Sequence, residues 1–431
     1  LLNNKLSEGR LNLENRNNLL ESMTNDIASL VTKNNYLQTQ ALSVELTSAS
    51  TRFDSYERLM RALESAGHLN RKVESLPSEE LLSERLKNGL SLTRPELAVL
   101  LASAKISVFS SLVDTDIYKD TYLAQDLERY FPSAIVDQHP ELIPQHTLKR
   151  EIIATSVANS MLNRAGCYFV NEMVEATNQP VSEIARAYAA ARHVFSLREL
   201  WIEIESLDNK ITPQLQMTLL AEARRLLEHG TLWFLGSREK SIDVTQIIND
   251  FSDGVASLGE VIEEVLSPEK REKVFIEREE LVSYGVPEGV ARMIAAVDPL
   301  LSACDIVEIS ETIGMEVKSA AAAYFAVGAE FRIDWLRDQI EELHNDNHWQ
   351  QRAVKTMAKD LFSHQRLLSI KILQTYSDET SVENAMKAWR DNNSEILNKT
   401  SKVLDEVRSS GKIDLSMLAI ANAEIRMLIG N

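Results

Sequence analysis

The stretch LTRPELAVLLASAKISVFSSL, residues 92–112, decides the fold of this chain because it has the pattern of a long apolar helix. Thr93 and Glu96 have the spacing of a capping box, and Pro95 stands in the first turn, where a missing amide proton costs little. Leucine and alanine side chains then recur at helical spacing, and Lys105 is the only charge after Glu96 in this stretch. We expect a helix buried on most of its sides, with other helices packed around it.

The composition of the whole chain favours helices throughout. Glycine accounts for 14 of 431 residues, about half of the roughly 7% found in average proteins. Alternation of β-branched residues with a period of two, which marks strands, is almost absent. We therefore predict an all-α fold, a multi-helix array in two or three subdomains with little or no β-sheet.

The charge balance is acidic, with 46 Lys and Arg against 64 Asp and Glu and a net charge of −18. Binding to nucleic acids and to anionic membranes relies on Lys and Arg that neutralise phosphate, so we predict neither partner. No uninterrupted apolar run approaches the ~18 residues of a membrane span. Leu1 and Leu2 open the chain with neither an initiator Met nor a secretion signal pattern, and we expect a piece of a longer polypeptide.

The two cysteines, Cys167 and Cys304, each stand within a helical pattern and have no partner at CxxC spacing. This usage does not suit a disulfide framework and fits a reducing, cytoplasmic location. We predict that both thiols are small core side chains rather than ligands or nucleophiles.

Changes in composition divide the chain into four segments. Residues 1–47 form a linker and helices, in which residues 1–16 are expected to be loop and Asn34 with Asn35 to break the helical pattern. Residues 48–236 form a helical domain. Residues 237–284 are strongly charged and predict an exposed helical hairpin with its turn at Ser267-Pro268, either a projecting pair or a domain connector. Residues 285–431 form a C-terminal helical domain that includes a long helix over 349–375.

Glycine spacing argues against a nucleotide site. A dinucleotide-binding loop needs G-x-G-x-x-G, and no two glycines of this chain stand two residues apart. Gly254 and Gly259 have the internal spacing of a phosphate loop, but Glu260 follows where a lysine is required and would repel phosphate. We predict no cofactor-binding residues.

Histidines offer one weak metal candidate. His344 and His348 are four residues apart on a predicted helix, and Glu341 precedes His344 by three, as in half of a di-iron motif. No second half occurs, so a polar helix end is the preferred interpretation and a helical-bundle metal enzyme a minor alternative. Near a proline-rich loop, His146 is expected to bond the following helix. We predict no catalytic and no metal-binding residues.

Two further patterns have an ordinary structural interpretation beside a functional one. PVSEIARAYAAARHV, residues 180–194, is reminiscent of the first helices of a helix-turn-helix, but no basic recognition helix follows, so we favour an ordinary amphipathic helix. Arg94 and Arg150 stand at the beginnings of apolar helices, and we expect Arg150 to be paired across a helix–helix contact.

Several stretches resemble the C-terminal region of the large NAD-specific glutamate dehydrogenases of bacteria, in the order in which that family has them. The two specific ones are LTRPELAVLLASAKI (92–106) and LKREIIATSVANSMLNRAGCYFV (148–170). The shorter ones are NNYLQTQALS (34–43), YFP (130–132), LWIEIESLDNKI (200–211), DIVEIS (305–310), YFAVGAEFRIDWL (324–336) and HWQQRAVKTMAKDL (348–361).

The resemblance implies a parent enzyme that converts L-glutamate to 2-oxoglutarate and ammonium with NAD as cofactor. It also implies that the catalytic and nicotinamide-binding residues lie upstream, since no position in this chain matches one. On this view residues 1–47 adjoin the missing catalytic domain, and the chain is a structural, oligomerising and possibly regulatory part of a homo-oligomer that binds no NAD itself. The alternative is an independent helical interaction scaffold without activity.

Overall fold

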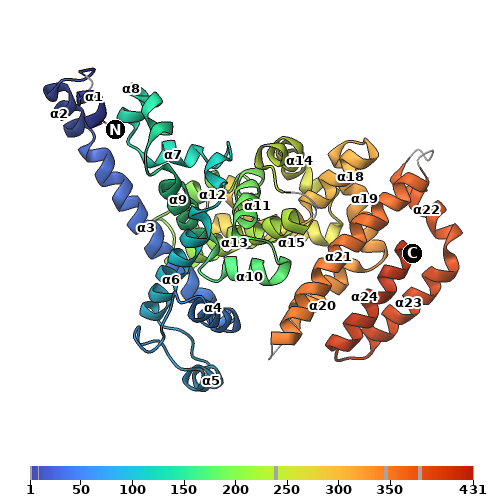
Figure 1. The fold of residues 1–431 in the computed structure, drawn as a ribbon. Coiled ribbons are helices and arrows are strands. Elements are labelled where there is room, and N and C mark those ends of the chain that lie inside the picture. Colours follow the sequence, from blue (N-terminus) through green and yellow to red (C-terminus); the bar gives the residue numbers. More distant parts are fainter. Residues whose placement is uncertain (1, 8, 237–240, 344–347, 377–380, 431) are drawn as a thin grey trace. The chain divides into compact units, whose positions relative to one another are not determined.

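The computed structural model describes residues 2–7, 9–236, 241–343, 348–376 and 381–430. Within these ranges all regular structure is helical, with 24 α-helices, two short 3₁₀ helices and no strand (Figure 1). The prediction of an all-α fold is confirmed. Two compact units, Leu1–Asn249 and Asp250–Asn431, meet within one helix, α14 (Val244–Val265).

Unit 1 begins with a long helix that the sequence divided wrongly. Helix α3 (Thr24–Ser48) runs without a break through Asn34 and Asn35. The neighbouring Tyr36 hydroxyl donates to Asp208 Oδ1 at 3.0 Å, so a tertiary contact outweighs the weak helix propensity of asparagine. Part of the expected loop over residues 1–16 is also helical. The other helices at this end are α1 (Leu2–Ser7), α2 (Leu13–Ser22), α4 (Phe53–Ser65) and α5 (Glu79–Lys87).

Helix α6 (Arg94–Val113) begins as predicted but is less enclosed than expected. The capping box is present, with the Thr93 amide donating to Glu96 Oε2 at 2.7 Å. Leu97, Leu100 and their neighbours at helical spacing are buried, and α6 packs against α9 (Lys149–Ala165). The opposite side is exposed, with Ile106 at 57%, so the expectation of burial on most sides is wrong.

The length and composition of α6 would suffice to cross a membrane, in contrast to the sequence expectation that no run approaches this length. Such composition is also typical of a core helix, and the buried leucine face of α6 against α9 has that character.

The centre of unit 1 is formed by α11 (Val181–Val194) and α13 (Pro213–Gly236), which pack closely along their lengths. Alanines on α11 and Gly230 on α13 allow this approach, since a Cβ added at Gly230 would lie 2.6 Å from the Phe195 ring. Ten residues of α11 are buried, so α11 is a core helix, more enclosed than the ordinary amphipathic helix that the sequence favoured. The remaining short helices are α7 (Gln125–Tyr130), α8 (Ser133–Gln138), α10 (Phe169–Thr177), α12 (Leu197–Glu205), η1 (Ile117–Lys119) and η2 (Pro140–Gln145).

Unit 2 continues from α14 to the C-terminal helices. The predicted hairpin helices are present, with Ser267 capping α15 (Pro268–Ser283). One face of α14 is buried, and its Gly254 lies against Val307. The expected long helix is α21 (His348–Thr375), which shares an apolar core with α20, α22 and α24. The other bounds are α16 (Glu288–Ala295), α17 (Val297–Leu300), α18 (Ala303–Ile313), α19 (Val317–Glu330), α20 (Ile333–Glu342), α22 (Val382–Asn392), α23 (Ser394–Ser409) and α24 (Leu415–Ile429).

Candidate functional site: an ionic core beneath an exposed helix face

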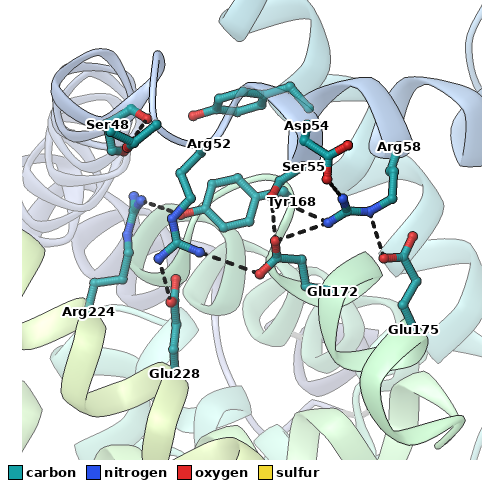
Figure 2. Close-up of polar contacts among 12 residues, drawn as sticks. Ser48, Arg52, Asp54, Ser55, Arg58, Tyr168, Glu172, Glu175, Arg224 and Glu228 are labelled. Atoms are coloured by element: carbon teal, nitrogen blue, oxygen red, sulfur yellow. Dashed lines mark hydrogen bonds and ion pairs between the residues drawn. The ribbon is translucent and has the colours of Figure 1, made fainter. Parts of the chain in front are cut away.

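A group of buried and half-buried polar and charged side chains joins α3, α4, α10 and α13 in unit 1. Figure 2 shows the part of the group that comes from α4, α10 and α13. We call it the ionic core and define it as Glu45, Arg52, Ser55, Tyr56, Arg58, Tyr168, Glu172, Arg224 and Glu228. Arg52, at the start of α4, contacts Glu172 at 3.5 Å and Glu228 at 3.1 Å (Figure 2). Its guanidinium carbon lies 5.2 Å from the centre of the Tyr168 ring. Arg52 therefore links α4 to both α10 and α13.

Arg58 extends the ionic core along α4. Its guanidinium pairs with Asp54 one turn earlier, with Glu172 at 3.3 Å and with Glu175 at 2.8 Å (Figure 2). The Ser55 hydroxyl donates to Glu172 Oε1, the same oxygen that Arg58 contacts. Glu172 is thus shared by two arginines and a hydroxyl, which satisfies a buried carboxylate as its desolvation requires.

Glu45 attaches α3 to the ionic core. It accepts hydrogen bonds from the Tyr56 hydroxyl and, at 2.7 Å, from the Cys167 amide. Arg224 lies 3.9 Å from Glu45 and donates to the Tyr168 hydroxyl at 3.0 Å. These contacts bring α13 and the beginning of α10 against the second half of α3.

Gly166 is required at this point of close approach. It ends α9 with φ +94°, a conformation that side chains other than glycine rarely adopt. A Cβ there would lie 2.6 Å from Glu45 Oε1 and 3.3 Å from the Arg224 guanidinium. The space around the carboxylate is therefore already filled by protein.

The electrostatics of the ionic core favour fixed protonation states. The Glu228 carboxylate raises the pKa of Arg52 above its usual value, and burial followed by the Glu45 carboxylate raises the pKa of Tyr56. Neither group changes its charge near neutral pH, so neither suits proton transfer. The ionic core can hold four helices in one orientation, and breaking such a pair costs about 3–5 kcal/mol.

The first half of α3 and the helix before it differ from this anchored part. Leu13 and Leu20, seven residues apart on α2, share one helix face, and both are exposed, Leu13 at 59%. Ile27, Leu30 and Val31 on α3 are exposed as well. Several large apolar side chains in 30 residues of one segment indicate an interaction surface rather than scattered exceptions.

Arg94 and Arg150, the two arginines noted in the sequence, make hydrogen bonds and a cation–π contact rather than a simple ion pair. Arg94 donates to the Ser43 hydroxyl at 3.0 Å and to the Thr39 carbonyl at 2.9 Å, which joins α6 to α3. Arg150 stacks on the Tyr118 ring at 4.4 Å from its centre, so the contact that the structure shows is cation–π.

The remaining candidates from the sequence take structural positions. Cys167 and Cys304 are buried as predicted, and burial raises the pKa of both thiols. The His146 ring accepts a hydrogen bond from the Leu148 amide at 3.1 Å, which confirms its predicted role before α9. Gly254 and Gly259 lie inside α14, where no phosphate loop can form.

The metal candidate cannot be placed in the same way. His344 lies outside the residues that the structure describes, and so does the side chain of His348. Among the described side chains, no group of three or more His, Cys, Asp or Glu is arranged to hold a metal ion.

Sequence reasoning missed the ionic core altogether. Its hydrogen bonds join residues as far apart in the chain as Ser55 and Glu172, 117 positions, or Arg52 and Glu228, 176 positions. No local spacing in the sequence identifies such pairs. Each of these residues, taken alone, looks like an ordinary polar residue on a helix. One available signal was charge within apolar helical stretches, and Arg224 between leucines of α13 is an instance.

Comparison with known proteins gives two family matches in different parts of the chain. A family described as the C-terminal part of glutamate dehydrogenase matches residues 89–427. A second family, described as the catalytic domain of bacterial NAD-glutamate dehydrogenase, matches residues 1–45. The catalytic-domain match thus includes the exposed leucines of α2 and ends at Glu45, the residue that enters the ionic core.

Individual relatives agree with these matches over nearly the whole chain. The chain is 36% identical over 425 residues to an NAD-specific glutamate dehydrogenase of Pseudomonas aeruginosa and 32% identical over 425 residues to one of Halomonas elongata. A third, from Mycobacterium tuberculosis, is 27% identical over 428 residues. Each alignment covers 99% of this chain but 26% of the relative, so the chain spans about a quarter of the length of the curated relatives it matches.

Proposed function

Because the chain belongs to the bacterial NAD-specific glutamate dehydrogenase family, whose C-terminal helical region it carries, we propose that it is the structural part of an enzyme that oxidises L-glutamate. That enzyme converts L-glutamate to 2-oxoglutarate and ammonium and reduces NAD. The catalytic groups lie in an upstream part of the polypeptide, and the present residues support that part without touching the substrate.

The observation that carries this proposal is the division of the first 48 residues. The exposed apolar side chains of α2 and of the first half of α3 fall inside the match to a catalytic domain. The second half of α3 is buried, and Glu45 is held by Tyr56 and Cys167. The exposed leucines of α2 are therefore suited to the catalytic part, and the helix that follows them is fixed in unit 1. Docking of this segment is how the helical region positions the catalytic domain.

Aspartate substitutions on α2 test the docking step. In the polypeptide extended to the start of its reading frame, the double variant Leu13→Asp, Leu20→Asp is expected to lower glutamate-dependent NAD reduction by about tenfold or more, because charge would be buried in an apolar contact. The same variant of the 431-residue chain is expected to keep its melting temperature, since both side chains are exposed there.

Leu86→Asp is the matched control, because Leu86 is an exposed leucine on α5 outside the catalytic-domain match. It is expected to leave NAD reduction unchanged. Full activity in the α2 double variant would contradict docking through this face. Full activity of the extended polypeptide after removal of residues 49–431 would favour the alternative of an independent scaffold.

We also propose that the enzyme is a cytoplasmic homo-oligomer and that helical surfaces of this chain contribute to its subunit contacts. Support comes from exposed apolar side chains in unit 2, among them Ile276 on α15 and Ile420 on α24. Light scattering after size exclusion is expected to give a mass several times that of one chain for the extended polypeptide. A monomeric mass would contradict the assembly role.

A further inference from the structure

Unit 1 contains a pocket of about 630 Å³ between the first half of α3, α7, α9, α11 and α12. We call it the arginine pocket. Its charged lining residues are five cations and two carboxylates: Lys33, Arg129, Arg164, Arg192, Arg198, Asp126 and Glu205. Five positive and two negative charges leave a local balance of +3, in a chain whose net charge is −18. This concentration of positive charge around an open space needs a physical reason.

Each of the two carboxylates is shared by two cations. Asp126 accepts from Arg129 at 2.7 Å and from Arg198 at 3.3 Å. Glu205 pairs with Arg164 at 2.7 Å and also with Lys33. The group around Asp126 and the group around Glu205 each contain two cations and one carboxylate. Each group therefore has a net charge of +1.

Arg192 is the fifth cation and the most deeply placed. Arg192 is only 3% exposed, and it lines the pocket. Nη1 donates to the Ser160 hydroxyl at 2.9 Å, while Nε and Nη2 have no hydrogen-bond partner among the described residues. A buried cation with two unsatisfied donors is costly unless an anion neutralises it.

Neighbouring groups act on these guanidinium groups in two directions. Burial opposes the charge of Arg192, but Tyr188, Asp126 and Tyr122 outweigh burial and raise the pKa of Arg192. Burial, followed by the charges of Arg192 and Arg129, lowers the pKa of Arg198 below its usual value. The Arg198 side of the pocket therefore keeps unfavourable positive charge, which an anion bound there would relieve.

The rest of the lining indicates the kind of anion. Trp201 forms part of the wall, with the Arg164 guanidinium 4.5 Å from its ring centre. Polar groups that suit hydrogen bonding come from α9, including Asn159 and Asn163. The apolar lining residues are Ile27, Leu30, Val31, Leu37, Phe131, Pro132 and Ile202. An apolar wall with a few convergent polar groups is typical of sites for small organic molecules.

We propose that the arginine pocket binds a small organic carboxylate. Carboxylate oxygens accept hydrogen bonds from the guanidinium groups on the Arg129 and Arg198 side of the pocket, since planar guanidinium groups bind carboxylates through paired hydrogen bonds. Arg192 adds a buried positive charge to the same lining. The carbon skeleton lies against Trp201 and the apolar side chains. This inference concerns binding by the 431-residue chain and does not depend on the proposed enzymatic role.

Isothermal titration calorimetry of the 431-residue chain with glutarate tests the proposal. Glutarate carries two carboxylates on a short apolar skeleton and is expected to bind, whereas pentanediol, its neutral analogue, is expected to give no heat. Inorganic phosphate distinguishes an organic acid from a simple oxyanion and is expected to bind more weakly. Absence of glutarate binding, or tighter binding of phosphate, would overturn the proposal.

Arg192→Met is the decisive variant. It is expected to weaken glutarate binding by about tenfold or more, because one of the positive charges that line the pocket is lost. Arg225→Met, on α13 and outside the pocket lining, is the matched control and should bind as the wild type does. Undiminished glutarate binding by Arg192→Met would contradict the assignment.

Discussion

The ionic core and the arginine pocket both bury guanidinium groups in unit 1, but they treat the positive charge differently. In the ionic core, Arg52 and Arg58 each contact two or more carboxylates, and Gly166 shows that the space around Glu45 is filled. In the arginine pocket, cations outnumber carboxylates, Arg192 keeps two free donors and about 630 Å³ stays open. The contrast teaches that the balance of buried charge, rather than burial itself, separates a structural cluster from a binding site.

The largest stability effect is expected from breaking the balance of the ionic core. Glu45→Leu removes the carboxylate that faces Tyr56 and Arg224, and it should lower the free energy of unfolding by about 3–5 kcal/mol, because a buried cation is left uncompensated. Chemical denaturation followed by circular dichroism measures the loss.

The matched control for this variant is Glu264→Leu, which removes an exposed partner of Lys318. Exposed pairs contribute about 0–1 kcal/mol. Comparable losses in the two variants would mean that the ionic core is no more important to the fold than a surface ion pair.

A second, smaller effect tests how tightly the ionic core is packed. Gly166→Ala should cost about 2–4 kcal/mol, since the new methyl group meets Glu45 and the backbone has a positive φ. Gly89→Ala has a positive φ of +68° but no atom within 4 Å, so backbone strain alone should cost about 1–2 kcal/mol there. Equal destabilisation by both changes would show that the ionic core has room to relax.

Lys105 on α6 provides the smallest effect and a third way to bury a cation. Its Nζ has no hydrogen-bond partner in the described part of the chain, and it does not line the arginine pocket. Burial lowers the pKa of Lys105 from 10.5 to about 8. Between these values the unfolded chain binds the proton and the folded chain does not, so this group makes stability rise with pH from about 8 to about 10.5.

Lys105→Met should therefore raise the free energy of unfolding by about 1–2 kcal/mol at pH 7, after allowance for partial exposure of the side chain. The gain should shrink as the pH approaches 10, which thermal denaturation across this range would measure. A gain that is independent of pH would show that added apolar contact, rather than removal of the charge, is responsible.

The sequence predicted those features of the fold that local patterns encode. The capping box at Thr93, the helical bond of His146 and the long helix α21 follow from spacings of a few residues. The break expected at Asn34 was wrong, because contacts of α3 with distant helices override local propensity. Scarce glycine and the absence of strand patterns were sufficient for the fold class.

Local sequence patterns could not predict the ionic core or the arginine pocket. Asp126 and Arg198 of the arginine pocket are 72 positions apart, and no periodicity relates them. Net charge was even misleading here, since an acidic chain conceals a locally basic pocket. The prediction that catalytic residues lie upstream came from the family resemblance, and glycine spacing agreed with it for the cofactor site.

The central claim is that this helical region supports redox chemistry located in another part of the polypeptide. The most direct test is a calorimetric titration of NAD into the 431-residue chain, beside the same titration into the polypeptide extended to the start of its reading frame. We predict binding to the extended polypeptide and none to the 431-residue chain. Micromolar binding of NAD by the 431-residue chain would contradict the claim.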